Sequence, residues 1–292
     1  MAAARPEDSK GDRDVPATIR QAVADAESKI VDAFGQRPVL EASIRHRLGV
    51  TYWYLGESQA AIAQHERALA LRREHLGPDH PETLRSLMNL AVAYREAGQL
   101  DKALPLSEEA QAKHETLGTD HRLTLALIDN LGLVYLDAGQ LDKALLQFER
   151  ALAQAQEQLG PDHPDSLQSM NHLARAYAQR GEFDRAERLL RRCLALRRRN
   201  QPEDWRTFHT LAQLGASLPG RQKHAEAEPL LLTGYQGMKQ RQATIPANDP
   251  KSLAEALQWL AQLYDSWGKP DQAQHWRQEL KQRKGATPRP AK

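Results

Sequence analysis

The sequence predicts an all-α solenoid of about six helix pairs behind a capping helix, and three columns of residues support this. Tyrosines recur at spacings of 42, 41 and 42 residues, at Tyr52, Tyr94, Tyr135 and Tyr177. A glycine follows each tyrosine by four residues, and an alanine follows each glycine by five: Gly56, Gly98, Gly139, Gly181 and Ala61, Ala103, Ala144, Ala186. Columns that keep one register indicate an internal repeat. Each unit of such an array packs on its neighbours, which gives a solenoid.

Each repeat contains two helical stretches, as the second repeat illustrates. Residues 83–97 place leucines, alanines and Tyr94 at helical spacing, which predicts one amphipathic helix. Gly98 is expected to end that helix in a left-handed conformation. A second stretch runs from Asp101 to about Leu117. The small side chains of Ala91 and Ala103 allow close approach, so the pair is predicted to form a helical hairpin.

Similar linkers join the repeats, at Leu76–Pro81, Leu117–Arg122 and Leu159–Pro164. In each linker Gly ends one helix and Asp and His offer capping groups, and in two of them Pro81 or Pro164 suits the first turn of the next helix. The fifth repeat departs from this pattern: Asp204-Trp205 replaces the linker, Leu218 replaces the tyrosine and Pro219-Gly220 interrupts the helix. We therefore expect its hairpin to buckle and to couple weakly to its neighbours. The sixth repeat recovers the pattern at Tyr264, Gly268 and Ala273.

These features predict the following domain organisation. Residues 1–14 are a disordered tail, and 15–36 form the amphipathic N-terminal capping helix. Residues 37–284 form the repeat domain, with units at about 37–79, 80–120, 121–162, 163–203, 204–246 and 247–284. Residues 285–292 are a second disordered tail.

Composition excludes several functional classes. The 292 residues include 40 Lys and Arg against 38 Asp and Glu, so no global field attracts nucleic acid or an anionic membrane. The single cysteine, Cys193, excludes an intrachain disulfide framework. The N-terminus lacks an apolar signal region, and no apolar run approaches the length of a membrane span. We expect a cytoplasmic monomer that binds neither nucleic acid nor membrane.

No residue pattern predicts catalysis, a cofactor or a metal. His80, His121 and His163 are possible zinc ligands, but they lie in equivalent linkers about a helix diameter apart, which favours capping instead. Cys193 matches a packing position, so we expect a buried thiol rather than a nucleophile. Carboxylates are spread through the repeats, and no nucleotide loop or nucleophile elbow occurs. The sequence therefore predicts a protein that is not an enzyme.

An arginine run lies on the second helix of the fourth repeat, at Arg188, Arg191, Arg192, Arg197, Arg198 and Arg199. An arginine face can bind phosphate or RNA. No aromatic residue is interleaved for base stacking, and nearby acidic residues dilute the charge. We expect a solvated face, with a nucleic-acid-binding helical repeat as the less favoured alternative.

The columns resemble the tetratricopeptide repeat. The long unit and its LGPDHP linker resemble the roughly 42-residue subtype of kinesin light chains. Stretches such as Gln36–Gly56 and Glu203–Lys281 are most similar to repeat regions that follow the kinase domain in planctomycete-type bacterial serine/threonine kinases. The resemblance implies a right-handed α-solenoid that binds a partner protein. An alternative is a regulatory tail, or a regulator in trans, of such a kinase.

The resemblance also implies that the first helix of each pair lines a concave groove. Asn89, Asn130 and Asn171 resemble the asparagines that hold an extended peptide backbone in the kinesin light chain motif LNNLA, although Met88 and His172 replace asparagines of that motif. Arg95 and Arg175 would then select an acidic residue, and Asp129 would disfavour a second one. The expected groove residues are Asn89, Arg95, Asp129, Asn130, Leu133, Asn171, His172 and Arg175. The alternative is that the asparagines bridge adjacent helices.

Overall fold

The computed structural model describes residues 15–117, 121–245 and 251–286 of the chain. These residues form helices joined by short linkers, and no strand occurs among them, so the predicted all-α class is confirmed. The predicted N-terminal tail, 1–14, and residues 287–292 of the predicted C-terminal tail lie outside the described residues. Gly285 and Ala286, which we assigned to the C-terminal tail, belong instead to the last helix.

The chain divides into two compact units, at the junction between Gln99 and Leu100. This boundary lies inside the second predicted repeat. Unit 1 contains α1 (Val15–Phe34), α2 (Pro38–Tyr54), α3 (Ser58–Leu76) and α4 (Pro81–Glu96). Unit 2 contains α5 (Leu100–Leu117), α6 (His121–Asp137), α7 (Leu141–Leu159), α8 (Pro164–Gln179), α9 (Phe183–Asn200), α10 (Trp205–Ser217), α11 (His224–Gln240), α12 (Lys251–Ser266) and α13 (Pro270–Ala286), with short 3-10 helices η2 (Pro219–Arg221) and η3 (Gln242–Thr244).

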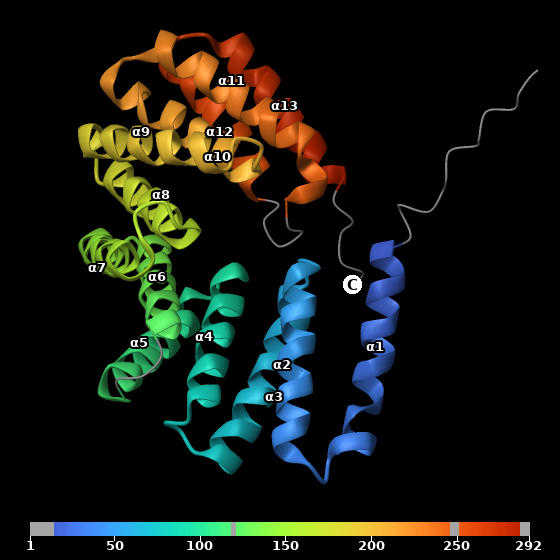
Figure 1. Ribbon diagram of the computed structural model, residues 1–292. Coiled ribbons are helices and arrows are strands. Elements are labelled where there is room, and N and C mark those ends of the chain that lie inside the picture. Colours follow the sequence, from blue (N-terminus) through green and yellow to red (C-terminus); the bar gives the residue numbers. More distant parts are fainter. Residues whose placement is uncertain (1–14, 118–120, 246–250, 287–292) are drawn as a thin grey trace, which may run out of the picture. The chain divides into compact units, whose positions relative to one another are not determined.

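In unit 1, α2 and α3 form the first helix pair and run side by side (Figure 1). The capping helix α1 packs on α2 and buries Val23 and Ile30. Glu27 of α1 accepts hydrogen bonds from the Tyr52 hydroxyl at 2.8 Å and from the Gln64 amide at 2.6 Å. The predicted N-terminal cap is therefore held by apolar and polar contacts together.

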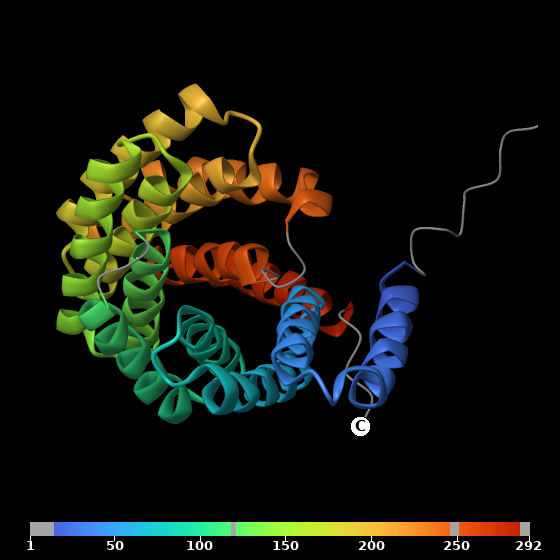
Figure 2. The same cartoon turned by 60° about the horizontal axis from the view of Figure 1, so that its bottom comes forward.

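In unit 2 the helix pairs α6–α7, α8–α9, α10–α11 and α12–α13 follow one another in chain order, from green to red in Figure 2. The first helix of a pair ends at the predicted glycine, and Gly181 has a left-handed φ of 84°. The amide of the next residue, Glu182, then donates to the Tyr177 carbonyl at 2.8 Å. This bond satisfies a carbonyl that the end of the helix would otherwise leave open.

Small residues three positions before the tyrosines allow the two helices of a pair to touch. A Cβ atom added to Gly132 of α6 would lie 2.6 Å from the Phe148 ring of α7. That distance is shorter than carbon atoms tolerate, so glycine is required for this close approach. Phe148 itself is fully buried.

Linker histidines cap the following helices, as the sequence suggests. Nδ1 of His80 accepts from the Glu82 amide, and Nδ1 of His163 accepts from the Asp165 amide, each at 3.2 Å. In the fifth repeat Asp204 takes this place and accepts from the Arg206 amide at 2.8 Å. The carboxylate thus performs the capping role of the histidine. The middle of the Leu117–Arg122 linker lies outside the described residues.

The fifth repeat keeps the register of the array, contrary to the expected buckling. The helix does break at Pro219, but Gln222 adopts φ 59° at the position of the missing glycine. The Lys223 amide donates to the Leu218 carbonyl at 3.3 Å, as in the other repeats. Leu218, at the tyrosine position, is fully buried. The helix pair is therefore formed in this repeat too.

Candidate partner-binding surface

The first helices of the pairs in unit 2 carry partly buried polar side chains that do not belong to the apolar core. We call these residues, with their apolar neighbours, the inner face: Asp129, Asn130 and Leu133 of α6, His172 and Arg175 of α8, His209 of α10, and Glu255 and Trp259 of α12. Arg175 and Glu255 contact each other although their helices lie two repeats apart. This contact means that the exposed sides of α8 and α12 turn toward each other.

Arg175 lies between two carboxylates and holds neither closely. Its guanidinium is 3.7 Å from Asp137 and 3.9 Å from Glu255, and its side chain is 37% exposed. Both distances exceed those of a charge-assisted hydrogen bond, which is typically about 2.8 Å. Within the described part of the chain, Arg175 has no closer acidic partner. Its hydrogen-bonding capacity is thus largely unused by the protein.

The same region contains two aromatic rings. His209 lies 3.5 Å from the second carboxylate oxygen of Glu255, and its ring centroid is 5.8 Å from that of Trp259. Glu255 is therefore shared between His209 and Arg175. Together these residues connect α8, α10 and α12 along the inner face.

Asp129 and His172, both predicted site residues, contact each other. Their Oδ1 and Nδ1 atoms are 2.9 Å apart, and this contact joins α6 to α8. The His172 ring also packs against Phe148, with centroids 5.6 Å apart. Because both partners are less than a quarter exposed, the pair mainly ties adjacent repeats together. Asn130 is half-buried beside them, and Leu133 is buried.

Asn171 lies in the core and not on the inner face. Only 7% of the residue is exposed, and its amide donates to the Thr210 hydroxyl at 2.8 Å. Its side-chain oxygen accepts from Cys193 at 3.3 Å, and its backbone carbonyl accepts from Gln213. This arrangement corresponds to the alternative that we weighed, an asparagine that bridges adjacent repeats. We therefore do not include Asn171 in the candidate surface.

Two of the predicted groove residues, Asn89 and Arg95, lie on α4 in unit 1. The Asn89 amide is 3.3 Å from Nδ1 of His46, and Arg95 forms an ion pair with Glu96. The Arg95 side chain is only 13% exposed. Both residues thus have partners within their own unit.

The tyrosine column has a role that the sequence analysis missed. The hydroxyl of Tyr135 donates to Glu108 at 2.6 Å, that of Tyr177 to Glu149 at 2.7 Å, and that of Tyr264 to Glu228 at 2.5 Å. In each case the glutamate lies on the second helix of the preceding repeat. Burial, and then the bond to Glu108, raise the pKa of Tyr135 to about 12, so the hydroxyl remains a donor. The regular occurrence of Glu five residues after Ala103 and Ala144 is a sequence signal for the first two ties.

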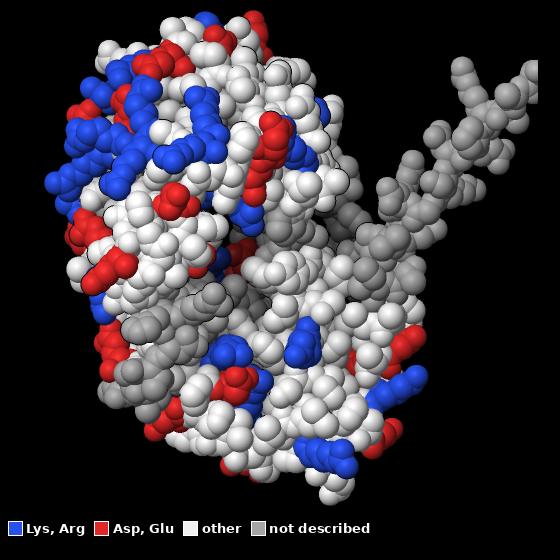
Figure 3. Space-filling view, viewed as in Figure 1, with Lys and Arg blue, Asp and Glu red and all other residues white. Residues whose placement is uncertain are grey.

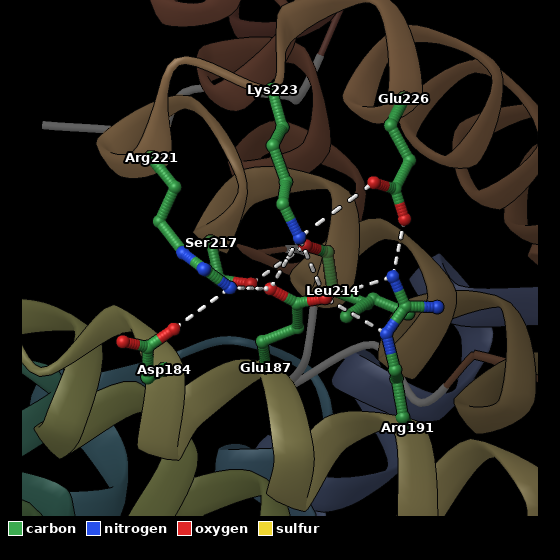
Figure 4. A network of polar contacts seen from close by, with 8 residues as sticks. All are labelled: Asp184, Glu187, Arg191, Leu214, Ser217, Arg221, Lys223 and Glu226. Carbon is green, nitrogen blue, oxygen red and sulfur yellow. Dashed lines mark hydrogen bonds and ion pairs between the residues drawn. The ribbon is translucent and has the colours of Figure 1, made fainter.

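A charged cluster replaces this tie between the fourth and fifth repeats (Figure 4). Glu187 of α9 accepts from Arg191 at 2.9 Å, from Arg221 at 2.7 Å and from Lys223 at 3.0 Å. Burial alone would raise the pKa of Glu187, but the bonds from Lys223, Arg191 and Arg221 outweigh it and lower the pKa to about 2. Asp184 and Glu226 complete the cluster through ion pairs to Arg221 and Arg191.

Cys193 is fully buried, as expected from its position in the repeat. Its thiol contacts the Leu167 carbonyl at 3.4 Å as well as Asn171. Burial raises its pKa, which works against the thiolate that a nucleophile needs. The residue therefore belongs to the packing between α8 and α9.

Comparison with protein families gives a match to the tetratricopeptide repeat over residues 40–116 and 123–199, which is more than half of the chain. The chain belongs to the tetratricopeptide repeat family. The last two tetratricopeptide repeats lie beyond the matched residues. They keep the family register through Gln222 and Gly268, whose φ angles are 59° and 71°.

Several solved structures share this tetratricopeptide fold. A kinesin light chain protein of Podosopora anserina with nearly identical repeats is 27% identical, with a TM-score of 0.59 over 70% of this chain and 98% of that one. BtubC of P. vanneervenii is 23% identical, with a TM-score of 0.58 over 79% of this chain and 94% of that one. A Rap protein in complex with Competence and Sporulation Factor is 15% identical, with a TM-score of 0.68 over 90% of this chain and 68% of that one.

No curated protein matches the chain. Among the described residues, no helix is both long enough and apolar enough to cross a membrane.

Proposed function

We propose that this chain is a non-catalytic scaffold of the cytoplasm whose inner face binds an extended segment of a partner protein. The observation that carries the proposal is the position of Arg175, a partly exposed guanidinium between two distant carboxylates. The tetratricopeptide family supports it, since such repeats are typical of protein-interaction scaffolds. The solved complex of a Rap protein with Competence and Sporulation Factor shows that a related fold holds a partner.

The chemistry of Arg175 favours an acidic residue in the partner. A guanidinium binds a carboxylate best through two parallel hydrogen bonds, which Asp137 and Glu255 do not provide at 3.7 and 3.9 Å. A carboxylate from a partner can form them and displace Glu255. Glu255 then stays next to His209, so it is not left without a neighbour.

The rest of the inner face suits an extended backbone. Asn130 is half-buried and carries two donors and an acceptor on a short stem, which matches a peptide unit without sequence preference. Trp259 offers an aromatic surface at the other end of the set. We place the acidic side chain of the segment at Arg175 and its backbone along Asn130.

A peptide-display selection on the purified protein tests this function. The wild-type chain should enrich peptides that contain Asp or Glu at one fixed position, and Arg175→Gln should lose that position while keeping its fold. Arg277→Gln of α13 is a matched control, because Arg277 is also a partly exposed arginine that pairs with an aspartate, Asp265. Identical motifs from the wild type and Arg175→Gln would contradict the proposal.

A second candidate keeps this surface and takes a bacterial serine/threonine kinase as the partner. The resemblance of Gln36–Gly56 and Glu203–Lys281 to repeats that follow such kinases favours it. The chain would then act as a regulatory tail or as a regulator in trans. Co-purification with a kinase, and a change in that kinase's activity when the chain is added, would support this candidate. A kinase that neither binds the chain nor responds to it would argue against it.

A further inference from the structure

The second helix of the fourth repeat, α9, has an outer side rich in arginine. Residues Arg185, Arg188, Arg191, Arg192, Arg198 and Arg199 are all exposed. Lys and Arg gather over this part of unit 2 at the upper left of Figure 3, with some Asp and Glu among them. This is the strongest concentration of like charge on the face shown.

Four of these arginines have no acidic partner within the described residues: Arg188, Arg192, Arg198 and Arg199, which we call the basic stripe. The two others are neutralised, Arg185 by Glu182 at 3.0 Å and Arg191 by Glu187 at 2.9 Å. Positions 188, 192 and 199 follow one side of a helix at intervals of four and seven residues. They span about 16 Å along the axis at a rise of about 1.5 Å per residue.

Several exposed arginines elsewhere in unit 2 have close acidic partners, unlike those of the basic stripe. Arg150 of α7 contacts Glu115 at 2.8 Å, and Arg180 contacts Asp142 at 2.9 Å. Arg150 occupies the position of Arg192 one repeat earlier. The position of Arg188 one repeat earlier is taken by Leu146, a leucine that is 56% exposed. The outer side therefore combines unpaired positive charge with an exposed apolar side chain on the preceding repeat.

We propose that the basic stripe is a second docking surface, and that it binds an acidic segment of a protein. A guanidinium group binds a carboxylate through bidentate hydrogen bonds. The four arginines of the stripe therefore suit a segment with several Glu or Asp side chains. Leu146 supplies an apolar contact for a hydrophobic residue at one end of the segment. Single-stranded nucleic acid fits less well, because binding it normally requires aromatic rings on which bases stack. The exposed residues of α7, α9 and α11 include no aromatic side chain.

This surface is distinct from the inner face. The inner face lies on α6, α8, α10 and α12, whereas the basic stripe lies on α9. A partner can therefore contact the chain through both, with the acidic segment adding affinity or orientation. Because the stripe is intact in Arg175→Gln, and Arg175 is intact in a stripe variant, failure of one proposal leaves the other testable.

The test uses a fluorescent glutamate-rich peptide that contains leucine, and a fluorescent thymidine oligonucleotide, each titrated into the full chain. The triple variant Arg188→Gln, Arg192→Gln, Arg199→Gln removes three of the four charges of the stripe while keeping helix-forming residues. The control variant Arg180→Gln, Arg206→Gln, Arg277→Gln removes three exposed arginines that have acidic partners. Circular dichroism confirms that both variants fold.

We expect the stripe variant to bind the peptide roughly tenfold more weakly than the wild type, and the control variant to bind it about equally. Binding to the wild type should weaken as salt rises, since exposed charges are screened. Equal peptide affinity for the wild type and the stripe variant would overturn the proposal. So would an oligonucleotide that binds the wild type more tightly than the peptide does and loses affinity in the stripe variant.

Discussion

Leu218 in the fifth repeat takes the place of the repeat tyrosine, and Arg191 of α9 takes the place of the glutamate that the tyrosine binds in earlier repeats. Tyr177 and Glu149 are the corresponding pair one repeat before, at 2.7 Å. The tyrosine and the glutamate are both replaced at this junction, so neither a tyrosine hydroxyl nor a glutamate carboxylate is left there without its partner. Glu187 of α9 connects to the fifth repeat instead, through Arg221 and Lys223.

Removing the Glu187 charge should weaken the C-terminal repeats. Glu187→Gln leaves Arg221 and Lys223 without a buried carboxylate, and hydrogen bonds to charged groups contribute about 2 kcal/mol. Urea unfolding followed by tryptophan fluorescence should show a loss of that order, because Trp205, Trp259, Trp267 and Trp276 all lie in these repeats.

The pKa of Glu187 is about 2 against an ordinary 4.5. Its contribution is thus present above pH 4.5 and is lost as the pH falls toward 2. Unchanged stability of Glu187→Gln at pH 7 would contradict this account.

Restoring glycine at the left-handed position of the fifth repeat should stabilise the chain. Gln222 has φ 59°, a conformation that costs a residue with a side chain about 1 kcal/mol relative to glycine. Gln222→Gly should therefore raise the free energy of unfolding by about 1 kcal/mol. The reciprocal change, Gly181→Gln at φ 84°, should lower it by a similar amount. A destabilised Gln222→Gly variant would show that the side chain makes a contact worth more than the strain.

Unit 1 should lose stability in mild acid because of the buried His65 and the half-buried His46. Burial lowers the pKa of His46 and of His65 from 6.5 to about 4, with further lowering by Arg72 for His46 and by His46 for His65. The unfolded chain therefore binds protons that the folded unit does not. Stability is full above about pH 6.5 and falls as the pH approaches 4.

A single substitution separates this effect from general acid sensitivity. His65 occupies the position of Phe148 in a later repeat, and each ring lies against a glycine of the partner helix. His65→Phe should make the pH dependence of hydrogen exchange in α2 and α3 shallower between pH 7 and 4.5. An equally steep dependence in the variant would point to other groups.

Asn171 should matter for stability and not for partner binding. Its buried amide bonds to Thr210 and Cys193, so Asn171→Ala leaves polar groups unsatisfied at a cost of about 2 kcal/mol. Affinity for an inner-face peptide should remain as in the wild type under conditions where the variant is folded. A large loss of affinity without loss of stability would return Asn171 to the binding surface.

The fold was largely predictable because the periodic residues each impose a local structure. Glycines at Gly139 and Gly181 end helices by accepting left-handed angles, and small residues such as Gly132 set how closely helices approach. Gln222 was not predictable, since the surrounding repeat forces a conformation that glutamine does not favour by itself. The helix pair of the fifth repeat was not predictable either, since Leu218 is buried in place of a tyrosine and Glu187 accepts from Arg221.

The candidate surface was less predictable, because position on a helix does not show what lies opposite. Asp129 and Asn171 occupy equivalent positions in successive repeats, yet they have different partners. Asp129 pairs with His172, whereas the Asn171 amide faces Thr210 and Cys193. The pairing of Arg175 with Glu255, 80 residues away, depends on how α8 and α12 approach each other. Their sequences contain no local signal for that contact.

The proposed function depends most on Arg175, and calorimetric titration of a display-selected acidic peptide tests it most directly. We predict opposite effects from substitutions on the two sides of one ion pair. Arg175→Gln should weaken binding about tenfold, through loss of roughly 1.4 kcal/mol. Glu255→Gln should strengthen binding, because the partner's carboxylate no longer has to compete with Glu255 for the Arg175 guanidinium. If both substitutions leave the affinity unchanged, or both reduce it equally, the inner face is not the site at which the acidic residue binds.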